Sequence, residues 1–306
     1  RKNLEEFPSA LPEEAFKHMQ NLSNPKEIRY ISSPTENAQA RYLPQWIREN
    51  LTHPEKETAV VLCNESLLQP VLHSLPSEVK HINITMGFPL SQTPVYSFLN
   101  SLLELQLEGY QSKSGRFLYQ EVMAVLKHPY TRRLTPASEE LEKELTKNNR
   151  FYPLPSELQR DEFLSHLFQP IEGNASLVKY LTKTLEEVAS IYRNEDEKAK
   201  SEVFNQLYRE SIFRAYTTLN RFTTLIEEGS LKVQRETFRR LLVKVLSNTN
   251  IPFHGEPAIG MQIMGVLETR NLDFRNLILL SVNEGQLPKT GGDSSFIPYN
   301  LRKAFG

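Results

Sequence analysis

The sequence has very little cysteine and no long apolar run. Its only cysteine is Cys63, in a chain of 306 residues, which excludes an intrachain disulfide framework and a multi-thiolate metal site. No stretch approaches the roughly 18 consecutive apolar residues of a membrane span. The polar start RKNLEEFPSALPEEAF carries no secretory signal. These absences predict a cytoplasmic protein with no membrane partner.

An excess of charge of one sign is also absent. The 36 Lys and Arg residues are balanced by 37 Asp and Glu residues. A dedicated nucleic-acid binder is more often strongly basic, so a DNA partner would have to bind a local patch or a larger assembly. The hydrophobic fraction of 39% is ordinary for a globular protein and permits a sizeable core.

The common catalytic motifs are missing as well. The sequence has no G-x-x-x-x-G-K-[ST] phosphate loop, no H-E-x-x-H motif and no G-x-S-x-G nucleophile elbow. The nearest match to a nuclease metal cluster is Asp196-Glu197-Lys198, but the run NEDEKAKSE around it is typical of a solvated helix face. We therefore predict no catalytic residue, metal site or cofactor for this chain.

The first 90 residues follow the pattern of a parallel α/β layer. Strands are predicted at 27–33 (EIRYISS), 58–64 (TAVVLCN) and 81–87 (HINITMG), with helices at 35–51 and 65–76. Thr35 is a candidate N-cap of the first helix, and Pro44 is expected to kink or break it. Alternating strands and helices are typical of a parallel sheet covered by helices.

The pattern changes to helices between residues 91 and 250 and then returns to strands. LKVQRETFRRLLVKVL (231–246) is the last of the predicted helices. IGMQIMGVL and NLILLSV (276–282) then read as strands, the second a buried parallel one. The sequence thus predicts a linker with a short helix at 1–25 and a discontinuous α/β domain at 26–90 and 251–306, interrupted by a large all-helical domain at 91–250.

Basic residues gather on the predicted helix 231–246. Lys232, Arg235 and Arg239 share one edge of it, with Arg240 and Lys244 adjacent. Such an array can neutralise several DNA phosphates, which makes Lys232, Arg235, Arg239 and Lys244 candidate DNA-binding residues. The alternative is the ordinary solvated face of an amphipathic helix, since few aromatic residues are present there to stack single-stranded bases.

The stretch GMQIMGVLETRNLDFRNLILLSVNEGQLP (260–288) resembles motif V and the next strand of UvrD-like superfamily 1 helicases. The family pattern is roughly L-M-T-x-H-x-x-K-G-L-E-F, an apolar strand and an N/E-E-G-x-x-P loop. The matching residues are Ile263-Met264, Leu272-Asp273-Phe274, NLILL, and Asn283-Glu284-Gly285 with Pro288. The departures are Gly265 at the threonine position, Leu267 at the histidine, Arg270 at the lysine and Asn271 at the glycine.

This altered motif is most similar to the AddB/RexB-type subunits of bacterial helicase–nucleases, which keep a helicase-like fold. TAVVLCNESLLQPVLHSLP and NITMGFPLSQTPVYSFLNSLLEL resemble the motif IV region, where the chain enters the helical subdomain. The resemblance implies a second RecA-like (P-loop NTPase-type) lobe with an inserted helical subdomain. It puts Arg270, Asn271 and Asp273 near a nucleotide and Gly265 at a DNA-contacting position. The alternative is that 263–274 simply form a strand and turn.

Three functions follow from this resemblance. The first is a piece of a helicase–nuclease (ATP-dependent exonuclease) subunit in DNA recombination and repair, which contributes DNA binding or structural support beside a helicase or nuclease partner subunit. The second is part of an active superfamily 1 helicase, and the third is a non-enzymatic pseudo-helicase scaffold. ATP and Mg²⁺ would bind an earlier lobe of the intact protein, and a nuclease domain would come later. The start at Arg1 and the end at Gly306 lead us to expect a piece of a longer protein.

Overall fold

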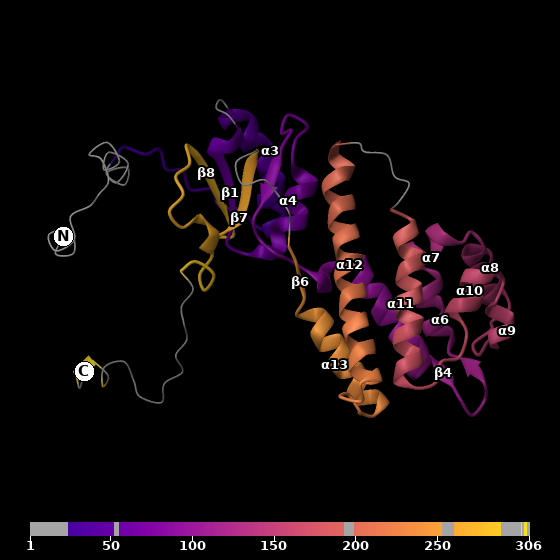
Figure 1. Ribbon diagram of the computed structural model, residues 1–306. Coiled ribbons are helices and arrows are strands. Elements are labelled where there is room, and N and C mark those ends of the chain that lie inside the picture. The colour runs from indigo at the N-terminus through magenta and orange to yellow at the C-terminus, as the bar shows by residue number, and fades with distance from the viewer. Residues whose placement is uncertain are drawn as a thin grey trace.

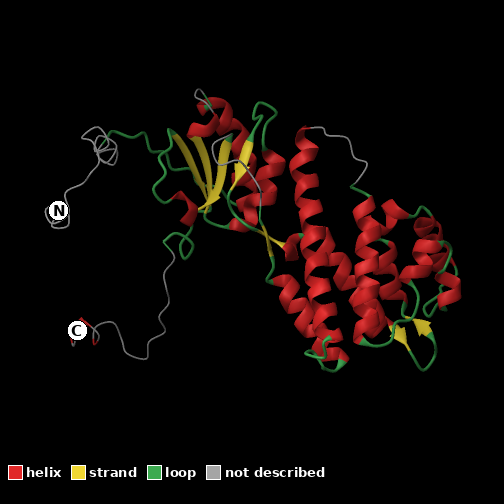
Figure 2. Ribbon diagram, in the orientation of Figure 1, coloured by secondary structure: helices red, strands yellow, loops and turns green. Residues whose placement is uncertain are grey.

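The computed structural model describes residues 24–51, 55–192, 199–252 and 260–288, with residues 301, 303 and 304. Figure 1 shows two parts: an α/β part that holds the main sheet, and a bundle of helices beside it. Figure 2 shows the same division, with the strands of the main sheet gathered in the α/β part. The short helix predicted in residues 1–25 and the triplet Asp196-Glu197-Lys198 lie outside the described residues.

The α/β part is built from both ends of the described chain. Its elements are α3 (Glu36–Asn50), β1 (Thr58–Leu62), η3 (Glu65–Leu67), α4 (Leu68–Ser74), β2 (Ile82–Ile84), β7 (Met261–Gly265), η6 (Leu267–Thr269) and β8 (Asn276–Leu280). The four strands are parallel, in the order β2-β7-β1-β8. Val60 of β1 is in register with Ile263 of β7 and with Ile278 of β8. The predicted discontinuous α/β fold, interrupted by a long helical stretch, is confirmed.

Burial explains why these short apolar runs became central strands. Every residue of β1 and β7 is buried, as expected of a parallel strand covered on both faces. Helices α3 and α4 pack together over one face of the sheet. Their buried residues Ala40, Leu43, Ile47, Leu68 and Val71 join the core with Val60 and Ile263.

The first strand predicted in this part is absent. Residues 24–33 contain no strand, and Tyr30 is 93% exposed. The alternation EIRYISS signals strand potential, but a strand also needs backbone hydrogen bonds to a neighbour, and 27–33 forms none within the described ranges. Of the two outcomes expected at Pro44, the break is absent, because α3 runs through this residue from its Thr35 cap to Asn50.

The helical stretch enters and leaves through one short ribbon. Strand β3 (Phe88–Pro89) pairs antiparallel with β6 (Asn250–Ile251), with Phe88 opposite Ile251. In Figure 1, β6 lies at the junction between the two parts. The chain therefore departs for the helical bundle and returns at nearly the same point, and the strands before and after can share one sheet.

The bundle contains two long helices and a set of shorter ones. Its helices are α5 (Pro94–Glu104), the π-helical η5 (Leu105–Gly109), α6 (Tyr119–Leu126), α7 (Pro129–Leu134), α8 (Ala137–Lys147), α9 (Pro155–Leu158), α10 (Glu162–Leu167), α11 (Asn174–Ser190), α12 (Ala199–Glu227) and α13 (Arg235–Ser247). A small hairpin, β4 (Tyr110–Gln111) with β5 (Arg116–Phe117), also lies within it. Helices α11 and α12 pack side by side. None of the helices in the described ranges is long and apolar enough to cross a bilayer.

Candidate nucleic-acid and nucleotide contacts

The arginines of the predicted basic stripe are used inside the fold. The guanidinium Nη2 of Arg235 donates to the carbonyl of Ile171 (2.8 Å) and to that of Gln106 (3.4 Å). Burial lowers the pKa of Arg235, while the nearby Glu172 raises it. Arg239 forms an ion pair with Glu108. These bonds fasten α13 to the η5 region, and they occupy two of the four side chains expected to meet DNA.

The rest of the stripe does not form a single helix edge. Helix α13 begins at Arg235, so Lys232 precedes it, and the expectation that Lys232 shares its edge is wrong. The reason is that residues 231–234 lead out of the turn after α12 and contact Asn174, whose amide donates to the Val233 carbonyl (2.9 Å). Lys232 and Lys244 are both exposed. A row of four cations for DNA phosphates is therefore not assembled here.

Gly265 ends β7 in acidic surroundings. A Cβ at this position would lie 2.5 Å from Oε2 of Glu268 and 3.3 Å from Oε1 of Glu65. Two carboxylates so close would repel a DNA phosphate. The neighbourhood of Gly265 is thus unfavourable for the phosphate contact that the resemblance implies.

The three candidate nucleotide residues lie on the connection from η6 to β8. Arg270, Asn271 and Asp273 are exposed, and Asn271 has φ 60°, a left-handed conformation that asparagine tolerates. The connection ends at Arg275, whose guanidinium pairs with Glu57 (2.8 Å) just before β1. Arg275 and Gly265 thus lie at opposite ends of the sheet, about 16 Å apart for strands of this length. Gly265 and Arg275, at the two ends of this stretch, therefore do not share one pocket.

A polar network at the carboxyl ends of β1 and β8 was not predicted. The Asn64 amide donates to both carboxylate oxygens of Glu36 (2.9 and 3.1 Å), and the Ser281 hydroxyl donates to the same carboxylate (2.9 Å). The Ser281 backbone amide donates to Oε1 of Gln39 (2.7 Å). Ligands of open parallel sheets often bind at this edge, but these groups bond one another and clamp α3 to the strands. Finding the network requires the strand order, since Glu36 and Ser281 are far apart in the sequence.

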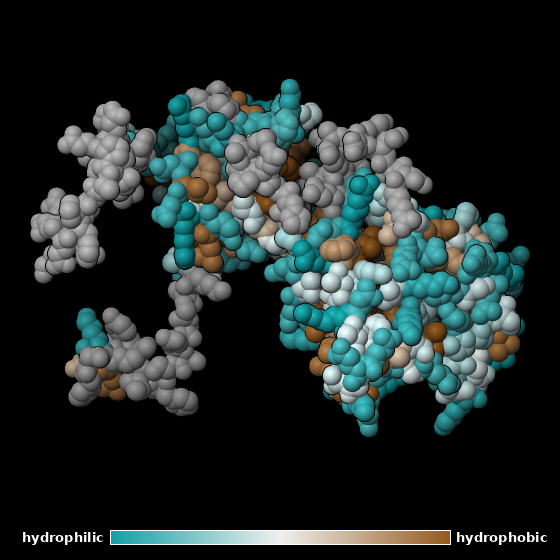
Figure 3. All heavy atoms as spheres, viewed as in Figure 1, coloured by the Kyte–Doolittle hydropathy of each residue, from teal (hydrophilic) through white to brown (hydrophobic). Residues whose placement is uncertain are grey.

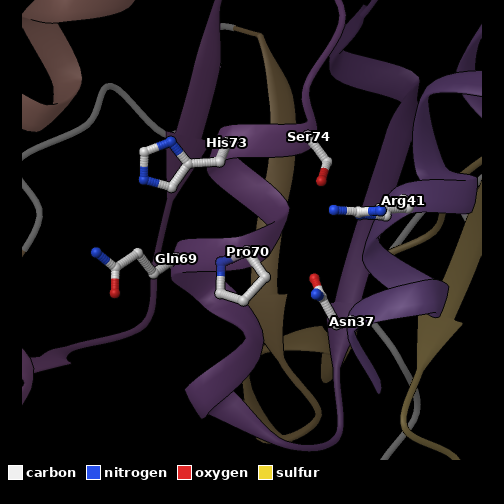
Figure 4. Close-up of a pocket in the computed structure, with 6 residues that line it drawn as sticks. All are labelled: Asn37, Arg41, Gln69, Pro70, His73 and Ser74. Atoms are coloured by element: carbon white, nitrogen blue, oxygen red, sulfur yellow. The ribbon is translucent and has the colours of Figure 1, made fainter. Parts of the chain in front are cut away.

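An open polar hollow lies between α3 and α4. It has a volume of about 420 Å³ and is lined by Asn37, Arg41, Gln69, Pro70, His73 and Ser74. Figure 4 shows the Arg41 guanidinium, the Asn37 amide and the Ser74 hydroxyl pointing toward one another, with His73 and Gln69 on the other side of Pro70. Within the described part of the chain Arg41 forms no ion pair. A cation with two neutral hydrogen-bonding groups can bind one phosphoryl group.

A second hollow, of about 730 Å³, lies between α11 and α12. It is lined by Leu185, Glu186, Ala189, Tyr192, Arg209, Ile212, Phe213 and Tyr216. Phe213 is 58% exposed there. The Arg209 guanidinium is held by the Tyr192 carbonyl (3.0 Å from Nε). This hollow, which we call the α11–α12 groove, is suited to aromatic or aliphatic side chains rather than to phosphates.

Within the described ranges, no group of three or more His, Cys, Asp or Glu residues is placed to hold a metal ion.

The chain was compared with known protein families and with curated proteins. No family model matches it, and no curated protein matches its sequence.

Proposed function

We propose that the chain is the second RecA-like lobe, with its inserted helical subdomain, of a helicase–nuclease subunit acting in DNA recombination and repair. The observation that carries this proposal is the split sheet. Strands β1 and β2 precede the helical stretch, β7 and β8 follow it, and all four form one parallel sheet. The stretch that resembles motif V forms β7, η6 and β8 of that sheet.

The lobe would support DNA processing rather than catalyse it. Its sequence has no phosphate loop, and Arg270, Asn271 and Asp273 would supply at most one wall of an ATP site. ATP and Mg²⁺ would bind chiefly to another lobe of the intact protein. Cleavage of DNA would belong to a nuclease domain or to the partner subunit.

The DNA contact of this lobe would be the hollow between α3 and α4. Arg41 is exposed and converges with Asn37 and Ser74, whereas Arg235 and Arg239 are engaged by Ile171 and Glu108. A single cationic contact predicts weak binding. On single-stranded DNA, each phosphate contact contributes about 0.7 to the slope of log K against log salt.

Fluorescence anisotropy with a labelled single-stranded oligonucleotide, at several salt concentrations, tests this assignment. We expect weak binding that Arg41→Ala reduces, with a lower salt slope. Arg221→Ala is the control, because Arg221 is an exposed arginine on α12. Equal loss in the two variants would contradict a contact at Arg41.

A scaffold that docks a partner subunit is the second candidate, and the α11–α12 groove favours it. The groove exposes Phe213 on the inserted helices, and exposed apolar surface of this kind marks protein–protein contacts. Absence of DNA binding even at low salt would favour this function over the first.

A further inference from the structure

The outer edge of the sheet at β8 is open. Strand β8 is the last in the order and pairs only with β1 among the described strands. Leu277 and Leu279 of β8 are 46% and 40% exposed. Figure 3 shows hydrophobic surface around this end of the sheet. An apolar edge strand invites pairing with another strand, and natural proteins generally cover such edges.

Helix α3 runs along β8 in the opposite direction. Its first turn lies at the carboxyl end of the strand, where Ser281 donates to Glu36 and Gln39. Its last residue lies at the amino end, where the Asn276 side-chain amide donates to the Asn50 carbonyl (2.8 Å). This is the position of the crossover helix in a β-α-β unit. The chain that enters α3 therefore arrives beside the carboxyl end of β8.

Handedness then selects one location for a strand before α3. Helices α3 and α4 pack on the same face of the sheet. Helix α4 connects β1 to β2, so this crossover moves along the sheet in the direction away from β8. Parallel crossovers are almost always right-handed, so two crossovers on one face step in the same direction. A strand that leads through α3 to β1 must then start on the β8 side of β1. Since β8 fills the adjacent place, the free place is the outer edge of β8.

The segment before α3 has the alternating pattern expected of a strand at the outer edge of β8. Residues 27–33 read EIRYISS, in which Ile28 and Tyr30 alternate with polar residues. In the structure Ile28 and Tyr30 are 66% and 93% exposed, and no backbone hydrogen bond joins 27–33 to β8. Extended at ~3.3 Å per residue, the segment covers about 23 Å, enough to run along all of β8.

We propose that residues 27–33 dock on the outer edge of β8 as a fifth parallel strand, a strap that the structure shows undocked. In the register we assign, Tyr30 lies beside Leu279 and Ile28 lies beside Leu277, so exposed apolar side chains cover one another. Ser32 then lies beside Ser281, close to the entry into α3. The inference rests on the contacts and handedness of the α/β part, and it holds whatever the function of the lobe.

Paired cysteines test the strap in the full chain. The variant carries Tyr30→Cys and Leu279→Cys, with the native thiol removed by Cys63→Ala. Neighbouring strands lie about 4.8 Å apart, within the range of about 4.4–6.8 Å that a disulfide spans between Cα atoms. We expect mild oxidation to give an intrachain disulfide in the monomer. The control pair, Tyr30→Cys with Val245→Cys, joins the strap to an exposed site on α13 and should remain reduced.

The outcomes separate the alternatives. Equal oxidation of the two pairs, or no oxidation of either, would overturn the proposal. Cross-linked dimers in place of monomers would mean that the edge takes the strand of a second copy, which also contradicts it. Hydrogen exchange on the unmodified chain provides a second measurement: amides within 27–33 should exchange at least tenfold more slowly than an unstructured segment, and exchange at the unstructured rate would contradict docking.

Discussion

At the residue scale, buried and partly buried polar side chains hold the helical bundle in place. The guanidinium of Arg235 satisfies the carbonyls of Ile171 and Gln106, and the Gln106 side chain in turn accepts from the Ile171 amide (3.1 Å). Groups of this kind are costly to leave without partners. Arg235 therefore stabilises the fold. In the sequence alone it is only one basic residue of a stripe, and this role cannot be seen.

Arg235→Ala should lower the free energy of unfolding by about 1–3 kcal/mol, because the two carbonyls lose a charged donor. Urea unfolding followed by circular dichroism measures the change. Arg240→Ala is the matched control: its pair with Glu236 is exposed and should be worth less than about 0.5 kcal/mol. Equal effects of the two substitutions would show that Arg235 is not fastened in this way.

His128 makes the stability depend on pH. Burial lowers its pKa to about 4, against a small opposing effect of the Pro94 backbone, and its Nδ1 accepts from the Tyr130 amide (3.3 Å). In the unfolded chain a histidine titrates near 6.5, so between about pH 6.5 and 4 the unfolded state binds more protons. Stability should therefore fall as the pH drops through this window, by roughly 2–3 kcal/mol for this group.

Urea midpoints at several pH values, for the wild type and for His128→Gln, isolate this effect. The variant should lose part of the acid sensitivity, whereas His73→Gln, which changes an exposed side chain, should keep it. An unchanged pH profile in His128→Gln would contradict a buried neutral imidazole.

At the element scale, β1 and β7 are buried throughout. The burial predicted for 276–282 is wrong, because Leu277 and Leu279 of β8 are exposed on a face of the sheet that the described helices leave open. TAVVL and MQIMG consist mostly of apolar residues, as is typical of central strands in a covered parallel sheet. The segment 27–33 instead alternates apolar and polar residues, a pattern that suits the edge position on β8 that we propose for it. Helix α13 begins at Arg235 rather than at 231, because the contacts of the preceding turn, and not helical periodicity, decide where it starts.

The shared sheet gives a direct prediction for β7. Ile263 is fully buried and pairs with Val60 of β1 and with Ile84 of β2, so Ile263→Ala should cost about 2–5 kcal/mol and Ile263→Val about 0.5–1.5 kcal/mol. Leu267→Ala, at a position that is 67% exposed, should cost less than about 0.5 kcal/mol. Equilibrium unfolding measures all three. A small cost at Ile263 would contradict its central place in the sheet.

At the scale of the whole molecule, the domain order was predictable and the contacts of the site were not. Strand and helix patterns are local, so the return of strand signals after residue 250 was enough to indicate a split α/β part. The ion pair of Arg239 with Glu108 spans 131 residues of sequence, and the Asn83–Gln262 hydrogen bond (2.7 Å) spans 179. No periodicity encodes such pairs, so the sequence alone could not show that Arg239 of the basic stripe is paired with Glu108.

The short ribbon predicts that the α/β part can fold without the bundle. Because Pro89 lies opposite Asn250, residues 90–249 can be replaced by an Asn-Gly turn, which suits a two-residue hairpin. The shortened chain should unfold cooperatively in urea, with a midpoint lowered by Ile263→Ala. A gradual transition, insensitive to that substitution, would show that the sheet depends on the inserted helices.

We propose that DNA binds this chain at the α3–α4 hollow and not at α13. The most direct measurement is photo-cross-linking of a single-stranded oligonucleotide to the chain, followed by identification of the linked peptides by mass spectrometry. The account predicts cross-links within 36–50 and 68–74 that Arg41→Ala diminishes. Cross-links concentrated in 231–247 would contradict it, as would a pattern unchanged by Arg41→Ala.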